Sequence, residues 1–291
     1  MISEPGAPIV TRFAPSPTGR LHLGHAFSAL ASHDLARRQG GAFLLRIEDI
    51  DAGRSREAFV EGIGEDLRWL GLSWDETPVR QSMRLDAYRA ALGALGAAEL
   101  LYPCFCTRAD IAAAASAPHG PEGAVYPGIC RHLDPGERAA RMAEEPHAWR
   151  LAMDRAVAFV GPITWHDARA GEVAANPARF GDVVLARKDA PASYHLAVVV
   201  DDAWQRVTDV VRGADLFEAT HIHRLLQALL GLPTPRYHHH ALLADPTGRR
   251  FAKRDGAPTI AALRETGADP QRLVADLRAG RMPVGLAATQ V

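Results

Sequence analysis

Residues 11–38, TRFAPSPTGRLHLGHAFSALASHDLARR, carry the pattern from which we infer the fold. Their first residues belong to a short apolar strand signal (residues 9–13). The chain then passes through a loop of Pro, Ser, Thr and Gly and becomes a helix. Gly40 and Gly41 end that helix, and AFLLRIED (42–49) reads as a second strand. This βαβ unit predicts an α/β protein with a parallel sheet, whose first helix begins where such sheets bind phosphorylated ligands.

Two histidines, His22 and His25, stand in the turn that enters the helix. Gly19 and Gly24 have the spacing of a P-loop, but His25 and Ala26 replace the Lys and the Ser or Thr that would hold phosphates and magnesium, and no GxGxxG follows the strand. Both common nucleotide motifs are therefore excluded. Two such histidines can also be plain polar residues of a helix cap.

The longer string RFAPSPTGRLHLGHA, followed by LRIEDID, resembles the HIGH signature region of class I aminoacyl-tRNA synthetases, specifically their glutamyl branch. That resemblance implies a Rossmann-like, doubly wound parallel sheet. It also implies that His22, Gly24 and His25 contact ATP, with the two histidines catalytic. The implied glutamate site consists of Arg12, Phe13, Ala14, Pro15, Ser16, Glu48, Tyr194 and Arg212.

Physical chemistry agrees with the roles that the resemblance gives to the charged residues of this site. Glu48 would hold the α-ammonium of the amino acid, since a carboxylate is the natural partner of a buried cation. Arg12 and Arg212, with Tyr194, would recognise the glutamate side chain, because a guanidinium offers two parallel donors to a carboxylate. Considered alone, an Arg at the end of a strand more often forms a surface ion pair, and it is the surrounding string that favours the role in binding.

A second signature, RRFAKRDGAPTI (249–260), resembles the KMSKS loop of the same enzymes. Arg250 and Ala252 stand where glutamyl enzymes commonly have Lys and Ser. Lys253 and Arg254 keep the positive charge that such a loop brings to a triphosphate as charge builds on the leaving pyrophosphate. We therefore expect Lys253 to be catalytic, Lys253 and Arg254 to bind ATP, and Mg²⁺ to accompany the ATP.

The three cysteines, Cys104, Cys106 and Cys130, lie close together in the sequence. Their odd number and the poor disulfide geometry of Cys-x-Cys favour a metal site over a disulfide framework. Zinc takes four ligands, and the fourth candidate is Tyr126 or His132. General chemistry favours the histidine, because a phenol has a pKa of about 10. The Cys-x-Cys and Tyr-x3-Cys spacing instead resembles the zinc site of the short glutamyl-Q synthetases, so we expect one structural Zn²⁺ with Tyr126, and His132 as the alternative.

Other patterns give further expectations. The apolar runs at 196–200 and 210–211 suit buried parallel strands, and HAWRLAM (147–153), AVAFV (156–160) and ITWHD (163–167) also resemble strands. His221 and His223 read as surface or half-buried residues of a helix without function. The run of histidines at 238–240 does not suit a metal site, because neighbouring residues of a strand face opposite sides.

The domain organisation that we expect has four parts: residues 1–101 as the first half of the catalytic domain, 102–190 as a small zinc-containing α+β insertion, 191–245 as the second half, and 246–291 as the KMSKS-like loop with a short helical segment. No anticodon-binding domain is expected. The chain has 291 residues, 47% of them hydrophobic, and a net charge of −1, so any contact with RNA must come from local patches. Without a signal peptide or a membrane span, we expect a cytoplasmic monomer.

A chain with both signatures and the cysteine cluster, and with no anticodon domain expected, resembles the glutamyl-Q tRNA(Asp) synthetases. That family activates L-glutamate with ATP and transfers it to queuosine in the anticodon of tRNA(Asp). Two alternatives remain open: a minimal glutamyl-tRNA synthetase that charges a tRNA 3′ end, and a non-catalytic RNA-binding paralogue, which only Arg250 and Ala252 favour.

Overall fold

The first βαβ unit forms as the sequence predicts. The computed structural model describes residues 8–107, 109–111, 119–120, 123–243 and 258–281. Strand β1 (Val10–Phe13) leads into helix α1 (Leu23–Arg38), and β2 (Ala42–Ile47) returns parallel to β1. The chain continues through α2 (Glu57–Trp69), the short parallel strand β3 (Val79–Arg80), a 3-10 turn η1 (Gln81–Met83) and α3 (Leu85–Ala97).

The second half of the sheet comes from the later part of the chain. It consists of β11 (Asp209–Gly213) and β12 (Arg236–His240), which are parallel, and of the hairpin β8 (Thr164–Asp167) and β9 (Gly171–Ala174), in which β8 runs parallel to β12. The two halves meet where Thr208 N–H donates to the Val10 carbonyl at 2.9 Å. The strand orders are β3-β2-β1 in the first half and β11-β12-β8-β9 in the second, and β1 lies beside β11. Strand β8 joins this sheet although it lies within the range predicted as an insertion.

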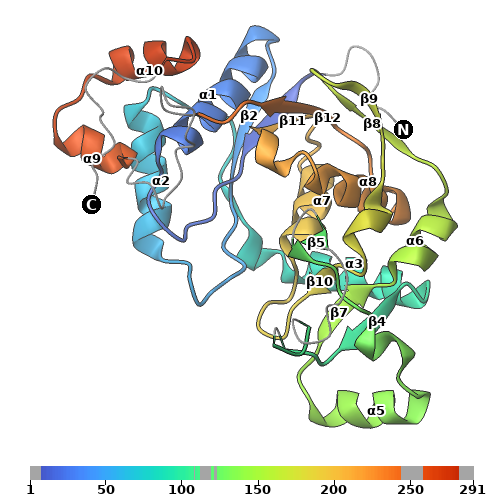
Figure 1. Cartoon of the computed structure of the whole chain (residues 1–291). Helices are drawn as coiled ribbons and strands as arrows, with labels where there is room; N and C mark the ends of the chain where they lie inside the picture. The colour runs from blue at the N-terminus through green and yellow to red at the C-terminus, as the bar shows by residue number, and fades with distance from the viewer. Residues whose placement is uncertain (1–7, 108, 112–118, 121–122, 244–257, 282–291) are drawn as a thin grey trace.

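Helices pack around both halves and form two separate apolar cores (Figure 1). Around β1 and β2 pack α1, α2, α9 (Ile260–Glu265) and α10 (Pro270–Arg278), and they share one apolar core. A second core is formed by α3, α6 (Met153–Val160), α7 (Tyr194–Trp204) and α8 (Ala219–Leu229). Short 3-10 turns, η3 (Pro177–Phe180) and η4 (Ala214–Leu216), link these elements.

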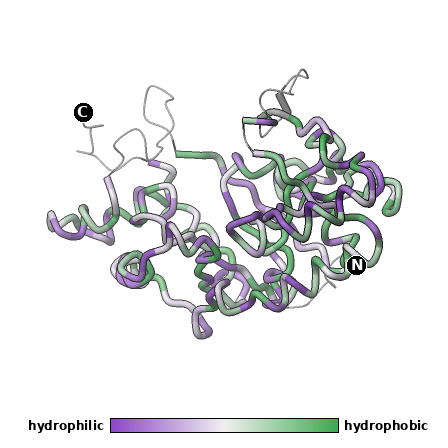
Figure 2. The backbone as a smooth tube through the Cα atoms, turned by 90° about the horizontal axis from the view of Figure 1, so that it is seen from below, coloured by the Kyte–Doolittle hydropathy of each residue, from purple (hydrophilic) through white to green (hydrophobic). Residues whose placement is uncertain are grey.

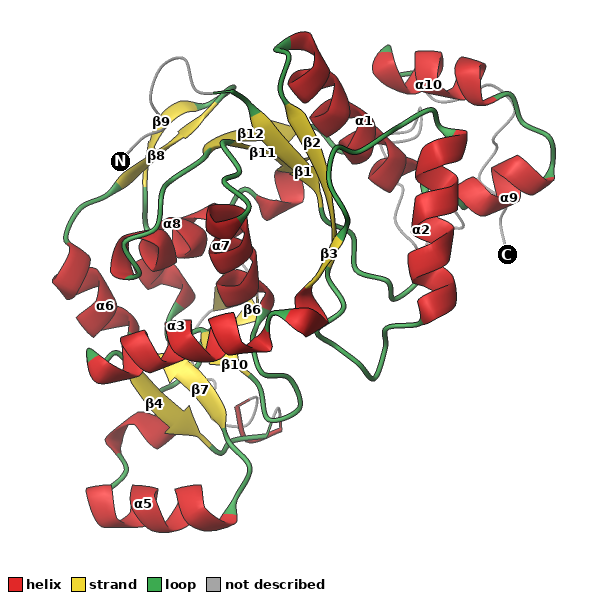
Figure 3. Ribbon diagram, turned by 180° about the vertical axis from the view of Figure 1, so that it is seen from behind, coloured by secondary structure: helices red, strands yellow, loops and turns green. Residues whose placement is uncertain are grey.

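A separate antiparallel sheet, β10-β7-β4, extends from the second core (Figure 3). Its strands are β4 (Leu101–Cys104), β7 (Ala148–Leu151) and β10 (Val184–Ala186). Helix α5 (Pro135–Glu144) lies at its far end, and η2 (Ile129–His132) packs beside β4. A two-stranded ribbon of β5 (His119–Gly120) and β6 (Gly123–Ala124) completes this region.

Two predicted strands are helices. The apolar run at 196–200 lies in α7. Ser193 caps the N-terminus of this helix, and its hydroxyl accepts from Leu196 N–H. AVAFV lies in α6. Both helices contribute to the second core, α7 with Leu196 to Val199 and α6 with Met153 and Ala156, and a continuous apolar run does not distinguish a buried helix from a buried strand. The strands predicted at 210–211, in HAWRLAM and in ITWHD are confirmed.

Hydrophobic and hydrophilic stretches alternate along the chain (Figure 2). No helix within the described residues combines the length and the apolar character that crossing a membrane requires.

Candidate active site

A cavity of about 640 Å³ opens at the carboxyl ends of β1, β2 and β11. Polar groups from both halves of the sheet line it, together with the first turns of α1 and α7. The structure brings into this one cavity every residue that was predicted to bind glutamate and every described residue that was predicted to bind ATP: Arg12, Phe13, Ala14, Pro15, Ser16, His22, Gly24, His25, Glu48, Tyr194 and Arg212.

The two histidines form the N-terminal cap of α1. His22 Nδ1 accepts from Gly24 N–H at 3.1 Å, and His25 Nδ1 accepts from His22 N–H at 3.2 Å. The rings stack with their centroids 3.7 Å apart. A Cβ atom at Gly24 would lie 3.0 Å from the His22 ring, so a larger residue there would crowd this cap. The cap fixes both imidazoles beside a helix N-terminus, which attracts anions.

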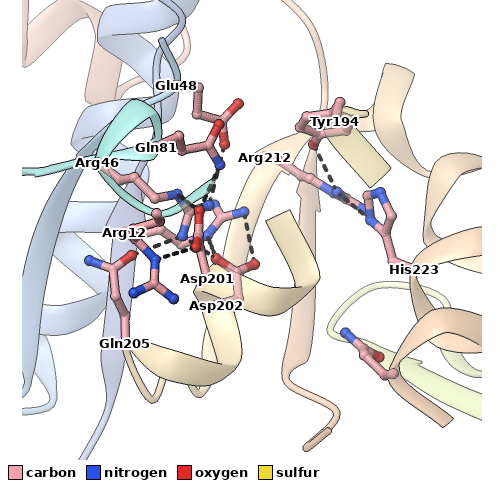
Figure 4. A network of polar contacts seen from close by, with 12 residues as sticks. Arg12, Arg46, Glu48, Gln81, Tyr194, Asp201, Asp202, Gln205, Arg212 and His223 are labelled. Atoms are coloured by element: carbon pink, nitrogen blue, oxygen red, sulfur yellow. Dashed lines mark hydrogen bonds and ion pairs between the residues drawn. The ribbon is translucent and has the colours of Figure 1, made fainter. Parts of the chain in front are cut away.

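Arg12 is held by an acid from α7 (Figure 4). Asp202 accepts from Arg12 Nε at 3.0 Å and Nη2 at 3.3 Å, and from Arg46 Nη1 at 2.7 Å. All three side chains are buried. Burial raises the pKa of Asp202, but Arg12 and Arg46 outweigh it and hold the pKa below its usual range. Asp202 is therefore an anion that joins β1 and β2 to α7.

Its neighbour Asp201 extends this network away from the cavity. Asp201 accepts from Gln81 at 2.8 Å, from Arg84 at 2.6 Å and from the Tyr88 hydroxyl at 2.7 Å. The two acids thus tie α7 to β1, β2, η1 and α3 through buried hydrogen bonds. Such a frame limits how far Arg12 can turn.

Glu48 follows the end of β2 and faces the cavity. Burial raises its pKa above the usual range, although Arg46 Nη2 donates to it at 3.3 Å. A carboxylate in this state gains from a cation brought by a ligand.

Arg212 lies near the end of β11 with a different set of partners (Figure 4). Its guanidinium donates to His239 Nε2 at 3.2 Å, to the Tyr194 hydroxyl at 3.3 Å, to His223 Nδ1 at 3.1 Å and to Thr220 Oγ1 at 2.6 Å. Within the described part of the chain, no carboxylate lies within ion-pair distance of it.

Lys253 and Arg254 lie outside the described residues, as do Arg250 and Ala252. The described residues on both sides of them reach the cavity region. Leu243 lines the cavity, and Thr259 forms a β-bridge with His22.

The three cysteines meet where β4 ends, beside η2. Their sulfur atoms all lie within 4.8 Å of one another, and the Tyr126 hydroxyl lies 3.5 Å from Cys104 Sγ and from Cys106 Sγ. A tetrahedral zinc with Zn–S bonds of about 2.3 Å needs sulfur atoms at such separations, so this donor set fits the ion. His132 is exposed on η2, and within the described residues no histidine joins the cluster.

Comparisons with known proteins agree with this geometry. The family model for the catalytic domain of class I tRNA synthetases (E and Q) matches residues 8–287. The chain is 51% identical to the glutamyl-Q tRNA(Asp) synthetase of Rhodobacter capsulatus, over 93% of this chain and 98% of that protein. It is 47% identical to the enzyme of the same name from Deinococcus radiodurans, over 92% of this chain and 88% of the other. The chain belongs to the glutamyl-Q tRNA(Asp) synthetase family.

Solved structures agree with this assignment. A glutamate tRNA ligase from Elizabethkingia meningosepticum, crystallised with its amino acid, matches with a TM-score of 0.78 and 29% identity. The match covers 93% of this chain and 60% of that ligase, which is the longer protein. The resemblance to the class I synthetases of the glutamyl branch, inferred from the sequence, is confirmed, and so is the catalytic-domain fold.

In this member of the glutamyl-Q tRNA(Asp) synthetase family, the sequence prediction was wrong about the exposure of His221 and His223, which were expected at the surface or half buried. His223 is only 1% exposed, and its ring binds Arg212. His221 is also buried, but it accepts from Asn176 N–H at 3.1 Å and does not line the cavity. Asp202 was missed altogether. Two adjacent acids directly after the five apolar residues 196–200 were the available signal, because buried carboxylates need partners.

Proposed function

We propose that this chain is an ATP-dependent ligase that activates L-glutamate and transfers it to queuosine in the anticodon of tRNA(Asp). The observation that carries the proposal is the pattern of charges in the cavity. Glu48 is a buried carboxylate whose pKa is raised in spite of its ion pair with Arg46, and Arg212 is a guanidinium with neutral acceptors. An amino acid with an acidic side chain would offer its α-ammonium to Glu48 and its side-chain carboxylate to Arg212.

In the proposed reaction an oxygen of the glutamate α-carboxylate attacks the α-phosphorus of ATP. Pyrophosphate leaves, and the glutamyl group then passes from the adenylate to a hydroxyl of the RNA while AMP leaves. The protein acts mainly by placing the reactants and stabilising charge. His22 and His25 would contact the phosphates at the N-terminus of α1, and Lys253 and Arg254 would contribute from the segment between Leu243 and Thr259. Mg²⁺ would neutralise phosphate charge.

The acceptor is tested by charging assays with three RNAs: tRNA(Asp) that carries queuosine, the same tRNA without it, and tRNA(Glu). We expect labelled glutamate to be transferred only to the first. We also expect ATP–pyrophosphate exchange that depends on glutamate and is not supported by aspartate. Exclusive charging of tRNA(Glu) would favour the minimal glutamyl-tRNA synthetase, and absence of both exchange and charging would favour the non-catalytic paralogue.

We propose that Cys104, Cys106, Tyr126 and Cys130 hold one structural Zn²⁺, which would crosslink β4 to η2. The ion would stabilise this region because its ligands come from separate segments of the chain. We expect metal analysis to find about one zinc per chain, and Tyr126→Phe to release zinc faster to a chromogenic chelator. His132→Ala is the matched variant and should leave zinc content and release unchanged. The reverse result for the two variants would assign the fourth ligand to His132.

A further inference from the structure

Arg212 differs from the other buried arginines beside the cavity in the charge of its partners. Arg12 and Arg46 both bind the Asp202 carboxylate. Arg212 is equally buried, with 5% of its surface exposed, yet its four hydrogen bonds in the described structure go to two imidazoles and two hydroxyls. A guanidinium has five N–H donors. Its orientation is thus fixed by neutral groups while its positive charge stays without a paired carboxylate.

The two imidazoles can serve as acceptors only in one tautomer each. His223 accepts at Nδ1, so its Nε2–H donates to His195 Nδ1, 3.1 Å away. His239 accepts at Nε2, so its Nδ1–H donates to Asp167 Oδ2 at 2.8 Å. Asp167 is fixed in turn by the N–H groups of Arg169 and Ala170, each at 2.9 Å.

Both imidazoles stay neutral at physiological pH. Burial and the nearby Arg212 hold the pKa of His223 well below its usual value. The same two causes lower the pKa of His239 to about 4, in spite of Asp167. The rings of His223 and His239 therefore bring neither a positive nor a negative charge into contact with Arg212.

We propose that His223 and His239 are positioning residues that hold Arg212 as an uncompensated cation, and that they thereby set the preference for a substrate with a side-chain carboxylate over one with a side-chain amide. This inference rests on the proposed glutamate site. A carboxylate in place of either imidazole would bind the same N–H groups but neutralise Arg212. The ligand carboxylate would then lose most of its advantage over an amide, because the fixed carboxylate would repel it and offset the charge of Arg212.

The test uses three substitutions at position 223 that separate shape from charge. His223→Asn keeps an acceptor near the place of Nδ1, His223→Asp places a negative charge there, and His223→Leu removes the acceptor. Glutamate and glutamine affinities are measured by calorimetry, and the KM values for glutamate and ATP by ATP–pyrophosphate exchange. We expect His223→Leu to raise the glutamate KM about tenfold or more, as loss of one bond to a charged donor implies. The ATP KM should stay within about twofold of wild type. His223→Asn should keep most of the glutamate affinity that His223→Leu loses.

The charge effect should appear in the comparison of His223→Asp with His223→Asn. We expect the Asp variant to lose the preference for glutamate over glutamine by about tenfold or more relative to the Asn variant. His239→Gln and His239→Glu repeat the comparison at Nε2, should a charge at position 223 prevent folding, which circular dichroism detects. His221→Leu is the control, because this buried histidine lies on the same helix but contacts Trp165 and Asn176.

The outcomes separate this inference from the proposed function. A wild-type protein that neither binds nor activates glutamate contradicts both. A wild-type protein that binds glutamate, with folded variants at 223 and 239 that keep its affinity and its preference over glutamine, contradicts only the role of the two histidines.

Discussion

Replacing Asp202 by alanine is expected to destabilise the protein by about 3 to 5 kcal/mol, as removal of one partner from a buried ion pair typically does. Asp202 is 6% exposed and binds both Arg12 and Arg46, of which Arg46 is completely buried. Its loss leaves Arg12 without its carboxylate partner and leaves Arg46 with Glu48 at 3.3 Å and Asp201 at 3.9 Å. The free energy of unfolding in urea measures the effect.

The control for this prediction is Asp154→Ala. The Asp154 carboxylate also pairs with an arginine, Arg131, but its side chain is 68% exposed. Exposed pairs contribute about 1 kcal/mol or less, so this variant should remain close to wild type. The prediction would be contradicted if Asp202→Ala cost no more than Asp154→Ala. Asp202→Asn keeps the shape and one acceptor oxygen, and it should fall between the two.

The sequence predicts the first βαβ unit well because the signals that define it are local. An apolar strand, a loop, a capped helix and a Gly-Gly stop lie within residues 9–49, and each acts through its own neighbours. The same reasoning fails at α7. There the run from Leu196 to Val200 is apolar without a break, and only its burial in the core with α3 and α8 decides that it is a helix.

For the site, too, the sequence predicts only those residues that a local pattern marks. Arg12, Glu48, Tyr194 and Arg212 were placed by resemblance to a family motif, and their presence in one cavity agrees with that placement. Their roles stay predictions. Their supporting partners could not be found that way, because Asp202 lies 190 residues from Arg12 and no local pattern links them.

The buried partners also explain why the cavity needs both halves of the chain. Arg12 and Glu48 come from β1 and from the end of β2, whereas Arg212 and Tyr194 come from β11 and α7. Asp202 crosses this division on one side of the cavity, and the Thr208 contact with Val10 crosses it within the sheet. A change that loosens either contact should therefore weaken glutamate binding without touching a residue that lines the cavity.

Replacing Arg212 by methionine is expected to lower kcat/KM for glutamate activation by a factor on the order of 10³, comparable to the loss of a fixed donor in an active site. The side chain carries the positive charge assigned to the substrate carboxylate and is held by four hydrogen bonds in the described structure. Arg212→Lys keeps the charge but not the planar fork that meets His239 and Thr220, so an intermediate loss is expected. Arg224→Met is the matched variant, since Arg224 lies on α8 and donates to the Thr164 carbonyl away from the cavity. ATP–pyrophosphate exchange at several glutamate concentrations gives the measurement. Equal activity of the Met and Lys variants would show that charge at this position does not select the substrate.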